Sequence, residues 1–318
     1  MSTYKEIAGT DIEVLSSDPA NPVEGQVWYN STSNVVKGLI NNVNGSWATA
    51  TSMNNNRNFL ATAGADNTSV LAFGGSPTSF VESYNGTSWT SETNLTTTRN
   101  GLVGFGESST SALAVGGEAP PGVVANTESW NGSAWTELND LNTGKVQFAG
   151  TNGPQTAGLV FGGLDPASTA TATTESWNGT SWTEVNDLNT ARREMGGAGV
   201  QNSALCFGPA SPNVCESWNG TSWTEVADLN TGRETPGGGG FSNTDVLAFG
   251  GNAGGATGEN EKWNGTAWTV TPVSMNTGRY KMGTNGSTSS ALAAGGTPNV
   301  ATVEEYDAGL QTLTFTDS

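Results

Sequence analysis

The sequence predicts an all-β protein: a six-bladed β-propeller that follows a short N-terminal arm. Three observations lead to this prediction. One phrase returns six times, an apolar run ending in glycine, then a glutamate, an aromatic residue and, in most copies, Asn-Gly and a tryptophan. The copies repeat at roughly 40–50 residues, a period typical of propellers and other β arrays. Each copy also contains short strand-like segments bounded by turn residues.

The first 43 residues precede the repeats. The segment Asp18–Asn30, followed by Ser-Thr-Ser-Asn-Val-Val, is typical of an extended arm and a hairpin. We therefore expect two domains, an arm at 1–43 and the propeller at 44–318.

Each repeat begins with a basic residue that follows a tryptophan by ten residues in five copies and by eleven in the sixth. A Gly/Ala-rich stretch comes next, and we expect it to be the innermost strand, because small residues let backbones approach closely where blades meet. The apolar run, such as Val246–Phe249, is the second strand. It ends in Gly-Gly in five copies and in Gly208-Pro209 in the fourth. The basic residues are Arg57, Arg99, Lys145, Arg192, Arg233 and Arg279.

The third and fourth strands are joined by Asn-Gly, the strongest short hairpin signal. In the third copy, a two-residue loop at 178–179 would place Trp177 opposite Thr180 and Glu175 opposite Trp182. Residues two apart share a face of a strand, so we expect the glutamate and both tryptophans to face the next blade. The repeated glutamate is expected to be structural, either accepting hydrogen bonds or pairing with the repeated basic residue.

The two ends of the repeat array are complementary. Asn44–Trp47 is a fourth-strand phrase without earlier strands before it, and the last copy, from Arg279 to Tyr306, lacks such a phrase. We therefore expect the strand that carries Trp47 to complete the last blade. Leu310–Thr316 alternates like a further strand and is an alternative for that role.

Composition indicates how the core is built and which partners are excluded. Ten of the eleven tryptophans lie in the repeats, and such large side chains can supply the core. The net charge of −18 argues against nucleic acid and against an anionic membrane surface. No apolar segment is long enough to span a membrane, and the N-terminus lacks the pattern of a signal peptide. We expect neither a nucleic-acid partner nor membrane insertion.

The residue inventory argues against an enzyme. The chain has no histidine, which excludes histidine-based catalysis and histidine metal sites. Two cysteines alone cannot form a zinc site, and every arginine except Arg193 lies at the repeat position. We therefore predict no catalytic residues, no cofactor and no metal.

Two features leave alternatives open. Cys206 and Cys215 should lie on neighbouring strands, either as buried thiols or as a cross-strand disulfide. Acidic pairs recur after the fourth strand, and they are either turn residues or ligands of a divalent cation. A glycan hydrolase that uses carboxylates alone also remains an alternative. The acidic pairs are Glu137/Asp140, Glu184/Asp187 and Glu225/Asp228.

The repeat resembles the Kelch repeat of β-propellers in its basic residue, its apolar run ending in Gly-Gly, its aromatic residue and its tryptophan. The resemblance covers about residues 44–310, and it departs from the family in the shorter gap between the aromatic residue and the tryptophan. The N-terminal segment is similar to N-terminal segments of bacteriophage virion proteins, particularly tail fibres and appendages. This similarity implies localisation in the virion and an arm that docks to other virion proteins. The anchoring residues would be Asn21, Pro22, Trp28 and Tyr29.

The loops between the second and third strands vary most in length. Six residues separate Gly75 from Glu82, ten separate Gly117 from Glu128, and eleven separate Gly163 from Glu175. A rigid ring with variable loops is a common arrangement for recognition, although surface loops also tolerate length changes at little cost. Candidate ligand contacts are Glu118, Asp165, Asn213, Asn252 and Asn299.

The expected function is therefore that of a non-enzymatic phage particle component, a tail fibre, an appendage or a decoration protein. It would present the loop face to a glycan or protein of the host surface. The alternatives are a purely structural virion subunit that packs against its neighbours and the carboxylate-dependent glycan hydrolase.

Overall fold

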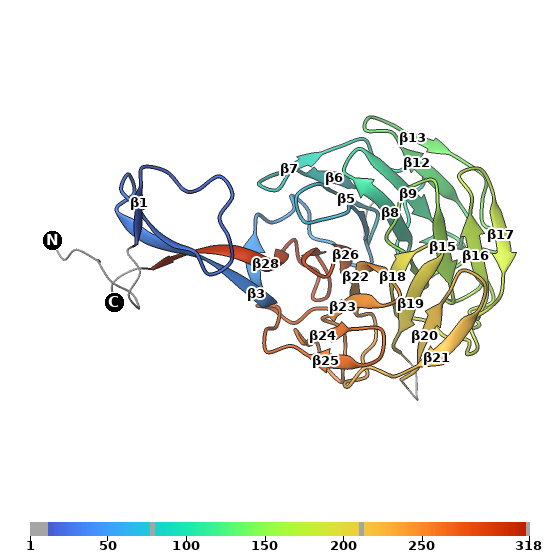
Figure 1. Cartoon of the computed structure of the whole chain (residues 1–318). Helices are drawn as coiled ribbons and strands as arrows, with labels where there is room; N and C mark the ends of the chain where they lie inside the picture. The colour runs from blue at the N-terminus through green and yellow to red at the C-terminus, as the bar shows by residue number, and fades with distance from the viewer. Residues whose placement is uncertain (1–11, 77–79, 210–212, 316–318) are drawn as a thin grey trace. The chain divides into compact units, whose positions relative to one another are not determined.

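The computed structural model describes residues 12–76, 80–209 and 213–315. Within these ranges the chain forms strands, turns and loops and contains no helix, so it is an all-β protein with a propeller fold (Figure 1). The chain divides into two compact units. The propeller unit comprises residues 47–306, and the terminal unit comprises the residues up to Ser46 together with those from Asp307 onward.

Five blades of the propeller unit are four-stranded sheets whose strands follow chain order from the axis outward, with antiparallel neighbours. The first blade contains β4 (Ala61–Ala63), β5 (Val70–Phe73), β6 (Val81–Tyr84) and β7 (Trp89–Ser91). The second contains β8 (Val103–Ser108), β9 (Ser111–Val115), β12 (Thr127–Trp130) and β13 (Trp135–Glu137), with a small hairpin of β10 (Glu118–Ala119) and β11 (Gly122–Val123) in its loop. The third contains β14 (Ala149–Gly150), β15 (Gly158–Phe161), β16 (Thr174–Trp177) and β17 (Trp182–Val185). The fourth contains β18 (Gly196–Val200), β19 (Ser203–Phe207), β20 (Cys215–Trp218) and β21 (Trp223–Val226). The fifth contains β22 (Gly237–Ser242), β23 (Asp245–Phe249), β24 (Asn260–Trp263) and β25 (Trp268–Val270).

The chain thus forms five four-stranded blades rather than the six predicted. The strands of the sixth copy belong to a six-stranded sheet in the order β1-β2-β3-β28-β27-β26. This copy lacks its own Asn-Gly-Trp phrase, so its third strand lies beside β3, the strand that carries Trp47. Residues 310–315 continue β28 and do not form a separate strand, and Thr316 lies outside the described residues. The six strands are β1 (Glu13–Leu15), β2 (Val27–Asn30), β3 (Val35–Ala50), β28 (Val303–Phe315), β27 (Ser290–Ala294) and β26 (Gly283–Gly286).

The glycine-rich first strands lie innermost, as expected. β4, β8, β14, β18, β22 and β26 each contact the next, and β26 contacts β4, so they form a closed circle. The close approach of inner strands from neighbouring blades explains why these strands are rich in glycine. A Cβ atom added at Gly238 would lie 2.3 Å from the carbonyl oxygen of Gly197 on the neighbouring blade. Any side chain at this position would force the two inner strands apart.

The hairpin between the third and fourth strands is longer than predicted. Trp177 pairs with Trp182 and Glu175 with Glu184, which leaves four residues in the loop, 178–181, instead of two. The Asn178 carboxamide oxygen accepts the N–H groups of Thr180 and Ser181, both at 2.9 Å. This side-chain turn closes a longer loop than the type I′ turn that Asn-Gly alone suggests.

The tryptophans pack between blades, but against the preceding blade and not the next one. Trp177 and Trp182 of the third blade join one core cluster with Phe105 and Leu113 of the second. Alternation along a strand tells which side chains share a face, but not on which side of the blade that face lies. Phenylalanines of one blade meet tryptophans of the next copy at ring-centroid distances of 4.9 Å for Phe161–Trp223, 5.4 Å for Phe207–Trp268 and 5.0 Å for Phe249–Trp47.

The terminal unit is organised around Asp18. β2 pairs with β1 in parallel and with β3 antiparallel. The Asp18 carboxylate accepts hydrogen bonds from Trp28 Nε1 at 3.0 Å, from Asn30 Nδ2 at 2.7 Å and from Lys37 Nζ at 2.6 Å. These donors, the Lys37 ammonium first among them, lower the pKa of Asp18 from 3.8 to about 2.

Acid should therefore loosen the terminal unit. Because the folded-state pKa of Asp18 lies below its ordinary value, the stabilisation is fully present above about pH 4 and is lost as the pH falls toward about 2. The Trp28 indole N–H signal in NMR spectra should shift over that interval. The Asp18→Asn variant should lack this transition, and an identical transition in that variant would contradict the assignment.

Candidate binding site

Residues with left-handed backbone surround the axis of the propeller unit. Each lies two residues after the repeated basic residue and shortly before the first strand of its copy. Left-handed backbone is costly for residues other than glycine, on the order of 1–3 kcal/mol each. We call this set the axial ring. Its members are Phe59, Gly101, Gln147, Glu194, Thr235 and Lys281, with φ between 46° and 62°.

Backbone hydrogen bonds join the axial ring from copy to copy. The Gly101 N–H donates to the Phe59 carbonyl at 2.9 Å, and the N–H groups of Gln147, Glu194 and Thr235 each donate to the preceding member in the same way. The Phe59 N–H donates to the Lys281 carbonyl at 2.8 Å, which links the first copy to the last. These bonds hold the strained backbone in place, since strained residues persist only where their surroundings determine their conformation.

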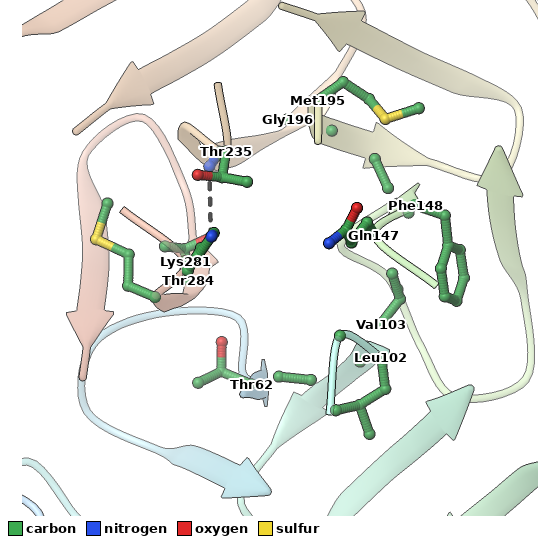
Figure 2. A pocket seen from close by; sticks show the side chains of 18 of the residues that line it. Thr62, Leu102, Val103, Gln147, Phe148, Met195, Gly196, Thr235, Lys281 and Thr284 are labelled. Atoms are coloured by element: carbon green, nitrogen blue, oxygen red, sulfur yellow. Dashed lines mark hydrogen bonds between the residues drawn. The ribbon is translucent and has the colours of Figure 1, made fainter. Parts of the chain in front are cut away.

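The axial ring lines a pocket of about 150 Å³ (Figure 2). Further lining comes from the first strands, at the position five residues after the basic residue. Asn152 also lines the pocket, and its Nδ2 donates to the Gly240 carbonyl at 3.1 Å, which ties the third copy to the fifth. The residues at the first-strand position are Thr62, Gly104, Gly150, Gly197, Gly238 and Thr284.

The pocket lining mixes polar and apolar side chains and is balanced in charge. Of the described residues that line it, Glu194 and Lys281 are the two that carry a charge. Lys281 Nζ lies 4.4 Å from the ring centroid of Phe59 and 5.3 Å from that of Tyr280. The aromatic rings therefore hold this ammonium near the axis by cation–π attraction. Threonine hydroxyls and the amides of Gln147 and Asn152 supply neutral hydrogen-bonding groups.

The repeated glutamates form buried ion pairs with the repeated basic residues. This confirms a structural role for the glutamates. The nitrogen–oxygen distances are 3.1 Å for Arg57–Glu82, 2.8 Å for Arg192–Glu216, 3.1 Å for Arg233–Glu261 and 2.9 Å for Arg279–Glu304. Arg99 pairs with Glu128, and Lys145 lies 3.9 Å from Glu175. Burial lowers the pKa of Arg57 to about 10, which Glu82 partly offsets, so the guanidinium remains charged at neutral pH.

The predicted loop residues have defined places. Glu118 begins β10 and is exposed, as is Asn299, while Asp165, Asn213 and Asn252 are partly buried. Asp165 accepts the N–H groups of Ala167 and Thr169, both at 2.9 Å. Asn213 Nδ2 donates to the Leu229 carbonyl at 3.0 Å, and Asn252 Nδ2 to Glu234 at 3.4 Å. These contacts shape the loops, and none of the five residues lines the axial pocket.

These loops nevertheless share a face with the pocket. Single β-bridges connect the residue before an axial-ring member to the loop that follows the second strand. Asn100 bridges Glu118 next to Gly101, and Glu234 bridges Asn252 next to Thr235. The variable loops and the axial pocket therefore open on the same side of the propeller unit, which we call the loop face.

The predicted anchoring residues differ in exposure. Asn21 is exposed, and Pro22 and Tyr29 are partly buried, with the Tyr29 hydroxyl donating to Asn34 Oδ1 at 3.0 Å. Trp28 is 0% exposed. It lies in the interior of the terminal unit and has no free surface to offer a partner.

The remaining chemical candidates have structural roles. Cys206 and Cys215 are free, buried thiols, and burial raises the pKa of Cys206 to about 12 and that of Cys215 to about 11. The aspartates of the acidic pairs accept backbone N–H groups: Asp140 from Thr127, Asp187 from Thr174 and Asp228 from Cys215. Among the described residues there is no group of three or more potential metal ligands, and no helix that could cross a membrane.

Comparison with protein-family models and with curated proteins finds no match to this chain. These two comparisons therefore suggest no role for the axial ring, which sequence reasoning missed. One signal for it was present in the sequence. Two residues after the basic residue, an otherwise regular repeat carries Phe, Gly, Gln, Glu, Thr and Lys in turn. Loops on a rigid scaffold vary more in sequence than the strands that they connect, and binding residues are often found on such loops.

Proposed function

We propose that this chain is a non-enzymatic bacteriophage virion protein that displays a Kelch-like ring on the particle surface, as a tail fibre, appendage or decoration protein. Its loop face would bind a glycan or protein of the host. The single observation that supports this proposal best is that loops of variable length and a pocket with both polar and apolar lining groups share one face of a rigid ring. Binding sites are commonly built from loops on such a scaffold.

We also propose that the ring functions with six blades. The sixth would consist of β26, β27, residues 303–306 of β28 and residues 47–50 of β3. Two contacts support this arrangement. Arg279 pairs with Glu304 at 2.9 Å, like the basic residues of the other copies. Trp47 packs against Phe249 with ring centroids 5.0 Å apart, like the tryptophans of the other fourth strands.

A non-catalytic role agrees with how the acidic side chains are used. The repeated glutamates face basic residues, and the aspartates that follow them are bonded to backbone N–H groups. A glycan hydrolase would need two carboxylates on either side of a substrate. Glu194 is the one carboxylate among the described residues that line the axial pocket.

The terminal unit is proposed to attach the ring to other virion proteins. Several of its apolar side chains are exposed, with Val14 at 65%, Val23 at 67% and Leu310 at 58%. Exposed apolar groups of this kind favour docking against another protein. Since Trp28 is buried, the docking surface would involve Asn21, Pro22 and these apolar side chains.

Adhesion can be tested with the purified full-length protein and host cells. The proposal predicts that cells retain the protein and that no sugar is released into the medium. Release of sugar would instead support the glycan hydrolase. The absence of both retention and release would support a purely structural virion subunit.

Attachment can be tested by particle incorporation. The double variant Val14→Asp/Val23→Asp should be incorporated at least about tenfold less than the unaltered protein, because buried charges weaken an apolar interface strongly. Val270→Asp is the matched control, since Val270 is also exposed, at 47%, but lies on the outer strand β25. Equal incorporation of all three proteins would contradict attachment through the terminal unit.

A further inference from the structure

We infer that the axial pocket binds a single neutral sugar residue of a host glycan, held by a hydrogen bond between a sugar hydroxyl and the Thr62 hydroxyl. The inference rests on the proposed binding role of the loop face and specifies its ligand. It follows from the size of the pocket, from its charge and from one polar group at the axis that lacks a partner.

The pocket has room for one ring. Its volume is about 150 Å³, and a cavity of about that size accommodates one six-membered ring. A longer segment of a glycan or a peptide would have to extend over the loop face, with one residue inserted at the axis. A terminal sugar residue satisfies this geometry.

The charge of the site favours a neutral ligand. Among the described lining residues, the negative charge of Glu194 balances the positive charge of Lys281. The whole chain carries a net charge of −18, which repels anions at long range. A cation would be attracted by Glu194 but repelled by the Lys281 ammonium, which cation–π contact holds 4.4 Å from the centroid of Phe59. Neither an acidic nor a basic sugar is matched by this lining.

Two threonine hydroxyls in the lining have no hydrogen-bond partner among the described residues. Thr62 is 3% exposed, and its Oγ1 is unpartnered. Thr235 is partly buried; its Oγ1 is also unpartnered, but Figure 2 shows this oxygen turned away from the opening. Figure 2 shows the oxygen of Thr62 turned toward the opening at the axis. A buried polar group without a partner is unfavourable. A ligand that restores its hydrogen bond therefore gains affinity.

The polar part of the lining matches hydroxyl chemistry. A threonine hydroxyl both donates and accepts, as does the Gln147 carboxamide through its two ends. Sugar hydroxyls have the same dual capacity and can satisfy such groups in several orientations. Phe59 adds an apolar surface for the C–H groups of a sugar ring.

Calorimetric titration of the full-length protein tests this inference. The neutral probes are the methyl glycosides of glucose, galactose and mannose, together with N-acetylglucosamine. The charged probes are glucuronate and glucosamine. We expect at least one neutral probe to bind with one site per chain, and both charged probes to bind at least about tenfold more weakly. Failure of every neutral probe to saturate the protein, or equal binding of the charged probes, would overturn the inference.

Variants test the role of the Thr62 hydroxyl. Thr62→Val removes the hydroxyl but keeps the shape, and it should weaken the bound sugar by about tenfold, the usual effect of one lost hydrogen bond. Thr62→Ser retains a hydroxyl and should bind within about threefold of the unaltered protein. Thr224→Val, on the exposed surface of β21, is the control that should change nothing.

Thermal unfolding of each variant is measured as the control for retention of the fold. If Thr62→Val and Thr224→Val bind the sugar with equal affinity, the assignment of the Thr62 hydroxyl as a sugar contact is overturned. The experiments distinguish failure of the pocket-ligand inference from failure of the proposed adhesive function. Retention on cells without binding of any sugar probe refutes the pocket ligand, whereas sugar binding without retention on cells refutes the adhesive function.

Discussion

Replacing Arg279 by methionine is expected to destabilise the folded protein by about 3–5 kcal/mol, the usual effect of breaking a buried ion pair from one side. The Arg279 side chain is fully buried and donates to Glu304 at 2.9 Å, to the Gly295 carbonyl at 2.8 Å and to the Thr302 carbonyl at 2.7 Å. Its loss leaves the buried Glu304 carboxylate without a countercharge. Denaturant unfolding of the variant measures the effect.

Two comparisons separate the effect of breaking the ion pair from a nonspecific loss of stability caused by substitution. The double variant Arg279→Met/Glu304→Gln should be less destabilised than Arg279→Met, because it removes the orphaned charge as well. Arg193→Met removes an arginine that is 53% exposed and should change the unfolding free energy by less than about 0.5 kcal/mol. Equal effects of Arg279→Met and Arg193→Met would contradict the structural role of the repeated pairs.

Replacing Trp223 by alanine is expected to cost about 3–5 kcal/mol, as truncation of a large core side chain usually does. The Trp223 ring packs against Phe161 of the preceding blade at 4.9 Å and against Trp218 of its own blade at 5.3 Å. Its Nε1 donates to Thr174 Oγ1 at 3.1 Å, again across the blade boundary. The variant therefore loses both a cavity-filling ring and an interblade hydrogen bond.

A graded series checks that the loss comes from packing between blades. Trp223→Phe keeps an aromatic ring and should be destabilised by less than half as much as the alanine variant, about 1–2 kcal/mol. A change of less than about 1 kcal/mol for the alanine variant would mean that the ring is not part of the core. Denaturant unfolding followed by circular dichroism serves for both variants.

Much of the fold could be predicted because repetition amplifies weak local signals. A single Gly-rich stretch or a single glutamate says little, but six copies at one spacing identify an inner strand and a structural acid. The pairing of Arg279 with Glu304 and its equivalents is one of the two structural roles expected for this glutamate. The place of Trp47 beside β28 could be predicted as well, because one copy had a fourth strand in excess and another lacked one.

The errors concern geometry that residue types do not specify. Asn-Gly indicated a two-residue hairpin, yet the Asn178 side chain closes a four-residue loop by accepting two backbone N–H groups. The period of the third strand correctly grouped Glu175 with Trp177, but the side of the blade depends on twist and packing. The last copy shares its sheet with the terminal strands, which a repeat count cannot show.

The axial ring could not be predicted for a different reason. Phe59, Glu194 and Thr235 adopt left-handed backbone although none is a residue type that favours it. Their conformation is imposed by hydrogen bonds between copies that are distant in the sequence. A pocket that depends on such contacts becomes visible only once the ring has closed.

Amide hydrogen exchange of the axial ring tests most directly whether the first and last copies close the ring around the pocket. The Phe59 N–H donates to the Lys281 carbonyl at 2.8 Å, while the Gly101 N–H donates to the Phe59 carbonyl at 2.9 Å within consecutive copies. In a closed ring the Phe59 amide should be protected to within about tenfold of the Gly101 amide, because both would be released only when blades separate. Exchange of Phe59 at the rate of an unfolded chain, with Gly101 still protected, would show that the ring is open between its first and last copies.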